Sequence, residues 1–344
     1  MRLCAFALNI SAKNFTPYNF YFNRTLMPLV VLLFALFASV FTIAKFALGT
    51  AEPFFLVGSR MIIAGVLLLS YQYCFHRAQF FFHKKHIWRI LRLSLFNIYL
   101  TNVFEFWGLQ YLTSFKTCFI YSLSPFISAL LCFLLFSEKL SRKKWIGLIV
   151  GFGGILPVLL SQTPSEELGG QLFVFSWAEL TVMAAATTAV YGWILLGQLV
   201  RDNGYSPMMA NGLSMLFGGI MALVHSSFIE TWNPIPVKEF IPYLECTLLL
   251  IVISNLICYN LYGFLLKRFS TIFMSFAGFI TPFFTALLGW FFLGEVVTWP
   301  FYVSAVLVFL GLLMFYREEL SAKKLAKVRY MEENNLLYVE SKTI

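Results

Sequence analysis

Long apolar segments separated by short polar ones run along almost the whole chain. A membrane-spanning helix needs about 20 largely apolar residues, and segments of roughly this length recur between loops that contain proline, glycine, asparagine and charged residues. The segments with this pattern lie at 27–49, 53–75, 88–110, 114–136, 145–160, 172–199, 206–229, 241–265, 270–293 and 299–316. The sequence therefore predicts an all-α integral membrane protein with ten transmembrane helices.

The same pattern divides the chain into five parts. Residues 1–26 precede the first helix, and the helices fall into a first half at 27–160 and a second half at 172–316. An outer loop at 161–171 joins the halves, and residues 317–344 form a tail of mixed charge. We expect the N-terminal segment and the tail to lie in the cytoplasm and the tail to follow the membrane surface.

Composition agrees with a protein that has lipid as its main solvent. Hydrophobic residues make up 60% of the 344 residues and charged residues 12%, whereas a soluble protein carries about twice that charged fraction. The formal net charge of +9 does not indicate nucleic-acid binding, because the basic residues lie in short loops, where they determine topology. The six cysteines form no CxxC pair, so we expect packing residues without disulfide or metal-binding roles.

The distribution of lysine and arginine orients the predicted helices. If the chain starts in the cytoplasm, the segments on that side carry 21 of the 25 basic residues. The opposite side carries only Lys116 and Lys238, while Lys45 and Arg60 lie inside predicted helices. Because a missed helix would scramble this alternation, the asymmetry supports ten spans with both termini in the cytoplasm. The expected location is a bacterial inner membrane.

Sequence features of the first half recur in the second half. Pro125 precedes Glu138 by thirteen positions, Pro282 precedes Glu295 by the same distance, and six of the fourteen aligned residues are identical at an offset of 157. Two further sets recur in the same helix order: Pro53, Gly58 and Gly65 against Pro207, Gly212 and Gly219, and Asn97 and Asn102 against Asn255 and Asn260. These correspondences predict an internal repeat of two five-helix units.

An odd number of helices in each unit has a consequence for topology. The second unit enters the membrane from the side opposite to the first, which makes the repeat inverted. Such repeats give a protein two nearly equivalent states, each open to one side, and this is the geometrical requirement for alternating access. We expect Pro125 and Pro282 to interrupt their helices, and Glu138 and Glu295 to make capping or gating contacts.

The paired Pro-x12-Glu helices, the glycine-rich helix after each, the duplication and the length resemble the EamA-type branch of the drug/metabolite transporter superfamily. The resemblance covers roughly residues 27–316, and within the superfamily the pattern is most similar to the S-adenosylmethionine transporters of intracellular bacteria. It implies ten helices packed around a central cavity near the middle of the bilayer. The superfamily carries many kinds of metabolite, so the motifs specify the family better than the substrate.

Ionisable residues inside the predicted helices are functional candidates, because burying them in hydrocarbon costs about 2.5–3.5 kcal/mol on insertion scales. Arg60 suits a substrate carboxylate, or an ion pair with Glu105 or Glu179. Glu105 suits a cationic substrate, a proton or an ion pair with Lys45 or Arg60. Lys45 suits a substrate contact, a gate or a side chain that extends to the interface. Glu179 and Glu245 lie near helix starts, where interfacial or helix-dipole roles are expected.

Neutral polar and aromatic residues complete the candidate set. Buried amides need hydrogen-bond partners, which neighbouring helices or a substrate can supply, and aromatic rings can stack on a ring-bearing substrate. The candidates for substrate binding or gating are Lys45, Arg60, Asn97, Asn102, Glu105, Tyr121, Tyr191, Asn255 and Asn260. No metal site, cofactor or catalytic group is predicted.

These features favour a secondary transporter or exchanger of a small metabolite, because the sequence contains neither a nucleophile–base pattern nor a phosphate-binding glycine loop. The first substrate expected from the resemblance is S-adenosylmethionine with S-adenosylhomocysteine, coupled to an ion or to an exchange substrate. An exporter of amino acids or lipophilic drugs is the alternative within this class. A membrane scaffold or sensor without transport is the alternative from another class, and the sequence does not determine the oligomeric state.

Overall fold

The structure is a computed structural model that describes residues 26–136, 140–161, 170–172, 175–269 and 271–317. Within this part of the chain, nine helices are long and apolar enough to cross a membrane. They are Met27–Ala47, Pro53–Phe75, Ser114–Leu131, Arg142–Leu160, Trp177–Arg201, Pro207–Ile229, Phe240–Leu265, Phe273–Leu293 and Trp299–Arg317. The protein is therefore an all-α, multi-pass membrane protein.

A further helical run occupies the position of the third predicted span. It consists of α4 (Ile87–Leu93), the π-helical segment η3 (Ser94–Leu100) and α5 (Thr101–Tyr111), which follow one another without a break. Polar residues such as Asn97, Asn102 and Glu105 make this run less apolar than the other nine helices. These three side chains line a cavity inside the bundle.

The remaining elements follow the spans predicted from the sequence, with short interruptions. They are α2 (Met27–Ala47), α3 (Pro53–Phe75), η1 (Arg77–Gln79), η2 (Lys84–His86), α6 (Ser114–Tyr121), α7 (Ser124–Phe136), α8 (Arg142–Gly154), α9 (Leu156–Leu160), β1 (Gln171–Leu172), β2 (Phe175–Ser176), α11 (Trp177–Arg201), α12 (Pro207–Ile229), α13 (Phe240–Leu250), η4 (Ile251–Cys258), α14 (Tyr259–Leu265), α15 (Thr271–Ala277), η5 (Gly278–Ile280) and α16 (Thr281–Leu293).

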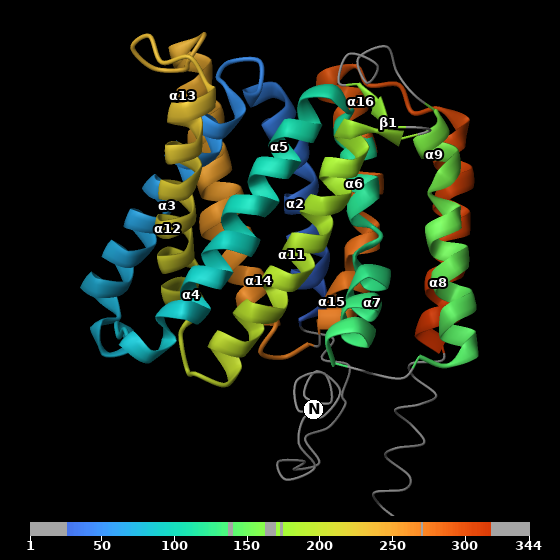
Figure 1. The fold of residues 1–344 in the computed structure, drawn as a ribbon, viewed down its shortest axis with the longest axis horizontal. Coiled ribbons are helices and arrows are strands. Elements are labelled where there is room, and N and C mark those ends of the chain that lie inside the picture. The colour runs from blue at the N-terminus through green and yellow to red at the C-terminus, as the bar shows by residue number, and fades with distance from the viewer. Residues whose placement is uncertain (1–25, 137–139, 162–169, 173–174, 270, 318–344) are drawn as a thin grey trace, which may run out of the picture.

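The helices run side by side between two faces of the molecule (Figure 1). One end of the bundle contains α3, α12 and α13, and the other end contains α8 and α9. Between them lie α2 and α11 (Figure 1). We call the face where α2 begins the basic face, because its connections carry Arg77, Lys84, Lys85, Lys267 and Arg268. The face where α2 ends is the opposite face, at the top of Figure 1.

The outside of the bundle is apolar. Large side chains are strongly exposed there, including Phe228 at 83%, Trp290 at 61% and Phe291 at 71%. A soluble protein does not leave so much apolar surface in contact with water. These side chains are suited to contact lipid.

Two helix starts differ from the sequence-based boundaries. The sixth helix was expected from residue 172 but begins at Trp177, because β1 and β2 form a small antiparallel pair just before it. Ser176 then caps the helix in a capping box with Glu179. The fifth helix begins at Arg142, three residues earlier than expected, because the Ser141 hydroxyl caps it.

Repeated glycines lie where equivalent helices of the two halves meet. A Cβ atom at Gly65 of α3 would lie 2.7 Å from the backbone nitrogen of Leu216 in α12, and one at Gly219 of α12 would lie 2.8 Å from that of Ile62. Any larger side chain at these positions would force the two helices apart. These glycines of the repeat therefore allow α3 and α12 to approach each other at backbone distance.

Helical irregularities also recur at equivalent positions. The π-helical segments η3 and η4 begin at Ser94 and Ile251, which are 157 residues apart. The fourth span breaks between α6 and α7, just before Pro125, and the ninth contains η5 just before Pro282. The predicted interruptions at both prolines are confirmed. Since π-helical turns are frequent at functional sites, η3 is a candidate part of such a site.

Candidate functional site

A cavity of about 130 Å³ lies in the interior of the bundle. We call it the central cavity. Side chains from both halves of the chain line it, and the polar and charged ones include Arg60, Asn97, Asn102, Glu105, Tyr121, Tyr259 and Ser275. Five of the nine candidates from the sequence, namely Arg60, Asn97, Asn102, Glu105 and Tyr121, therefore come together at one site.

Arg60 is the largest fully buried side chain in the described structure, with 1% of its surface exposed. One guanidinium nitrogen, Nη2, donates a 2.6 Å hydrogen bond to Oδ1 of Asn102, and the guanidinium lies 4.5 Å from the centre of the Phe106 ring. Nε and Nη1 have no hydrogen-bond partner among the described residues. A buried cation with free N–H donors is suited to bind a carboxylate.

Glu105 supplies a negative group to the same cavity. Its Oε2 accepts a 2.5 Å hydrogen bond from the hydroxyl of Tyr121. No ion pair joins Glu105 to Arg60 among the described side chains, and Glu179, the other expected partner of Arg60, pairs with Lys116. The central cavity therefore contains an acceptor for a cationic group close to a donor for an anionic group.

Asn97 is 1% exposed and lines the same cavity from the π-helical segment η3. Neither its Oδ1 nor its Nδ2 has a hydrogen-bond partner within the described structure. Leaving such a buried group unpaired costs about 1–3 kcal/mol, so an amide with both ends unpaired is an exception that a ligand can explain. Asn102, one helical turn away, is by contrast bonded to Arg60 and to the carbonyl oxygen of Ile98.

Aromatic side chains form part of the lining of the central cavity. The rings of Trp193 and Tyr262 stack with their centres 4.2 Å apart, and Phe37 contacts Tyr262 edge-on at 6.3 Å. Trp193 also lies 5.1 Å from Tyr259. Phe37 lies at the middle of α2, and Trp193 lies in the second half of α11. These rings present faces on which a planar ring can stack.

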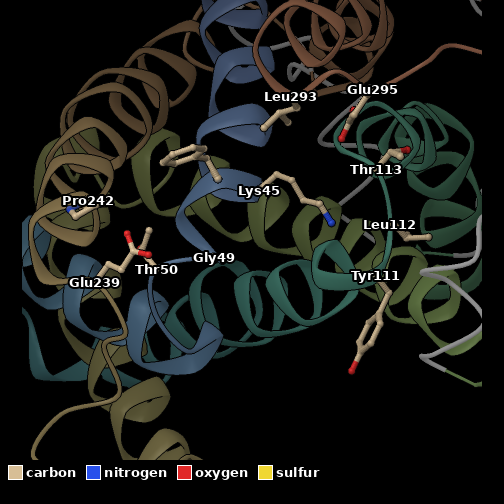
Figure 2. A pocket seen from close by; sticks show the side chains of 11 residues that line it. Lys45, Gly49, Thr50, Tyr111, Leu112, Thr113, Glu239, Pro242, Leu293 and Glu295 are labelled. Carbon is tan, nitrogen blue, oxygen red and sulfur yellow. The ribbon is translucent and has the colours of Figure 1, made fainter.

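The opposite face contains a larger pocket of about 600 Å³, which we call the vestibule. It is lined by the end of α2, by residues 111–113 and by residues near 239 and 295. Figure 2 shows Lys45 reaching from α2 toward the segment that carries Leu112 and Thr113. Its Nζ donates hydrogen bonds of 2.7 and 3.0 Å to the carbonyl oxygens of Leu109 and Gln110. Lys45 thus lies in the vestibule, one turn of α2 beyond Phe41, which lines the central cavity.

Acidic side chains cap helix starts at the opposite face. Glu295 accepts hydrogen bonds of 2.7 Å from the backbone nitrogen and from the hydroxyl of Ser114 at the start of α6. Glu230 does the same for α3 by accepting from the backbone nitrogens of Phe54 and Phe55. The contacts of Glu295 are those of a helix cap. Its repeat counterpart Glu138 lies outside the described residues.

Besides Lys45, three sequence candidates do not line the central cavity. Tyr191 packs edge-on against Phe96, with ring centres 4.8 Å apart. Nδ2 of Asn255 lies 3.1 Å from the sulfur atom of Met61, and Asn260 bonds to Asn211 of α12 and to carbonyl oxygens of its own helix. These side chains make contacts between or within helices, which was the alternative that the sequence left open.

The other two intramembrane glutamates also lie away from the cavity. Glu179 completes the capping box at the start of α11 and forms a buried 2.8 Å ion pair with Lys116. Glu245 is exposed near the start of α13. Their positions agree with the helix-start roles expected for them.

Comparison with known proteins identifies the family to which this architecture belongs. The pattern of the EamA-like transporter family matches residues 9–160 and 176–317, which is most of the chain. The chain belongs to the EamA-like transporter family. It is therefore a membrane transporter of small molecules and not an enzyme, as the sequence predicted.

Relatives of the EamA-like chain include proteins with a named substrate. A protein of Chlamydia muridarum named S-adenosylmethionine/S-adenosylhomocysteine transporter is 36% identical over 88% of this chain and 94% of its own length. One of the same name from Chlamydia trachomatis serovar L2 is 37% identical over 83% and 86%. Protein PecM of Dickeya dadantii is 27% identical over 72% and 80%. The resemblance to the S-adenosylmethionine transporters of intracellular bacteria is thus confirmed.

A solved crystal structure shares the fold of this EamA-like transporter. It is 16% identical, has a TM-score of 0.56 and matches 83% of this chain and 93% of the other. At this identity the comparison shows the arrangement of helices alone.

Several residues that line the central cavity of this EamA-like transporter were not among the candidates predicted from the sequence. Tyr259, Tyr262 and Ser275 are examples. Tyr259 and Tyr262 lie three residues apart, so they share one helix face. With 19% aromatic residues in the chain, however, an aromatic residue in a helix carries little information until its neighbours are known.

Proposed function

We propose that this chain is a secondary transporter that exchanges S-adenosylmethionine and S-adenosylhomocysteine across a bacterial inner membrane. The observation that carries the proposal is the pair of opposite charges in one buried cavity, Arg60 with two free donor nitrogens and Glu105 with its carboxylate. The names of the chlamydial relatives point to the same substrates.

The chemistry of the central cavity suits both ends of such a substrate. An amino acid carries a carboxylate, which Arg60 can bind, and an ammonium group, which Glu105 can bind. The sulfonium of S-adenosylmethionine is a cation that aromatic faces such as those of Tyr121 and Tyr259 attract. A cavity for lipophilic drugs has no need of a fully buried guanidinium with unpaired donors, which is why we favour a zwitterionic metabolite.

We further propose that transport proceeds by alternating access between two inverted five-helix units. The run Ile87–Tyr111 supplies the tenth span, and the equivalent π-helical segments and glycine contacts support the repeat. At about 130 Å³ the central cavity is smaller than ligand pockets of about 300–1,000 Å³. Substrate binding therefore requires widening, and the helix breaks before Pro125 and Pro282 are places where the backbone can bend.

The basic residues also predict how the protein is oriented in the membrane. The positive-inside rule puts the basic face and both termini in the cytoplasm, so that the vestibule opens to the outside. Single cysteines at Lys238→Cys and Lys84→Cys, introduced into a cysteine-free chain, test this orientation. An impermeant maleimide added to intact cells is expected to label position 238 and not position 84, and the reverse pattern would invert the topology.

Uptake by purified protein in liposomes tests the substrate. Radiolabelled S-adenosylmethionine is added outside, and protein-free liposomes serve as the control. We expect saturable uptake that S-adenosylhomocysteine inhibits and that methionine, leucine or a lipophilic cation inhibits much less. Equal inhibition by free amino acids would favour an amino-acid exporter, and no uptake at all would overturn the proposed substrate.

A further inference from the structure

Asn97 differs from the other asparagines of the repeat. Asn102 and Asn260 are hydrogen-bonded, and the amide nitrogen of Asn255 contacts the sulfur atom of Met61. Asn97 alone among the four lines the central cavity with both amide atoms unpartnered in the described structure. The repeated sequence pattern therefore produces an asymmetric site, with a free amide contributed by the first half.

The position of Asn97 is constrained by a close contact with α11. A Cβ atom added at Gly192 would lie 2.4 Å from the Cβ of Asn97 and 2.6 Å from its Oδ1. The glycine leaves just enough room for the asparagine, while α11 limits where the amide can go. A side chain that is buried, constrained and unpaired is suited to recognise a ligand with little loss of conformational entropy.

The chemistry of a free amide specifies what it can recognise. Asn97 offers one hydrogen-bond donor group beside one acceptor, and this pair matches the adjacent amino group and ring nitrogen on an edge of adenine. Planar rings also stack on aromatic side chains, and Trp193 and Tyr259 line the same cavity. These are the features of a nucleobase subsite.

The distance along the helix leaves room for the rest of the substrate. Asn97 lies eight residues before Glu105, which corresponds to about 12 Å along a helix at 1.5 Å per residue. Arg60 bonds to Asn102, between these two positions. The amino-acid end of the substrate would thus lie toward the opposite face, and its base toward the basic face.

We infer that Asn97 is the residue that recognises the adenine of the transported substrate, an inference that rests on the function proposed above. The site then binds an adenosyl amino acid by its two ends, at Arg60 and Glu105 and at Asn97. Free methionine would occupy only one end and bind more weakly. An unmodified adenine edge becomes a requirement for transport.

Modified bases test this assignment without any change to the protein. Uptake of radiolabelled S-adenosylmethionine is measured against increasing S-adenosylhomocysteine, and against its N6,N6-dimethyl, 1-deaza and 7-deaza forms. Removal of the amino-group donor, and of whichever ring nitrogen Asn97 contacts, is expected to weaken inhibition about 10-fold or more. Equal inhibition by all four compounds would overturn the inference.

Variants then locate the recognition at one residue. In Asn97→Leu, S-adenosylhomocysteine is expected to inhibit uptake less than it does in the wild-type protein. Its inhibition should exceed that of the N6,N6-dimethyl form by no more than about twofold, since the amide that distinguishes the two compounds is missing. Asn255→Leu is the matched control, because it removes a buried amide outside the cavity and should retain the wild-type preference. A preference that persists in Asn97→Leu would refute the role of Asn97 while leaving the transport function standing. If the wild-type protein takes up no S-adenosylmethionine, the proposed function itself fails and the inference with it.

Discussion

Replacing Arg60 tests whether its buried charge serves the substrate or the fold. In Arg60→Lys the positive charge remains, but the planar fork with its free Nε and Nη1 is lost. Two charge-assisted hydrogen bonds to a substrate carboxylate, at about 1.5–3 kcal/mol each, amount to about 3 kcal/mol or more. We therefore expect the KM for S-adenosylmethionine uptake to rise about 100-fold.

Stability should respond to Arg60 in the opposite sense. The guanidinium is 1% exposed and has no ion-pair partner among the described residues, so an apolar side chain of similar size relieves an unfavourable burial. Arg60→Met is expected to abolish uptake while the thermal unfolding midpoint in detergent stays unchanged or rises. Lys238→Gln is the control, because Lys238 is 60% exposed in its ion pair with Glu52 and such pairs contribute little.

The substrate offers a complementary test of the same contact. Decarboxylated S-adenosylmethionine lacks the group that Arg60 is proposed to bind, so it should compete poorly with the labelled substrate in the wild-type protein. In Arg60→Lys, which retains uptake with a raised KM, the difference between the two compounds should become much smaller. Wild-type KM in Arg60→Lys, or strong competition by the decarboxylated compound in the wild-type protein, would refute the reasoning.

Three further predictions concern the fold around the site. Glu179→Ala should destabilise the protein by about 3–5 kcal/mol in thermal or denaturant unfolding, because it removes the 2.8 Å ion-pair partner of the buried Lys116 cation. Adding Lys116→Met should recover much of the lost stability, and no loss in the single variant would contradict the role of the pair. Gly65→Val should lower the yield of folded protein in size-exclusion chromatography, since its Cβ would lie 2.7 Å from the backbone nitrogen of Leu216, and a wild-type yield would show that the helices can separate. Glu295→Ala should lower stability by about 1–2 kcal/mol through loss of the cap on α6, and an unchanged unfolding midpoint would show that solvent replaces the carboxylate.

The sequence predicted the helices well because each span carries a strong and independent signal. Lipid demands a long apolar run, and proline, glycine and charged residues mark where each run ends. Departures occurred where local capping took precedence, as at Ser176, which starts the sixth helix at Trp177 instead of residue 172. The glycines of the repeat were also informative, since Gly65 and Gly219, which occupy equivalent positions in the two halves, both lie at the contact between α3 and α12.

The side-chain partners were harder to predict because they depend on how the helices are rotated against one another. An ion pair with Glu105 or Glu179 was one of the two roles expected for Arg60, which instead bonds to Asn102, while Glu179 pairs with Lys116. The asparagines of the two halves look alike in sequence, yet Asn97 lines the cavity and Asn255 does not. Periodicity shows which residues share a helix face, and the packing of the helices against one another decides which residues that face contacts.

Exchange of S-adenosylmethionine for S-adenosylhomocysteine through the site that contains Arg60 and Asn97 can be measured as counterflow. Liposomes that contain the purified protein are loaded with S-adenosylhomocysteine, or left empty, and labelled S-adenosylmethionine is added outside. We predict much faster uptake into the loaded liposomes, with no such stimulation by internal methionine. Equal rates in loaded and empty liposomes would contradict the account.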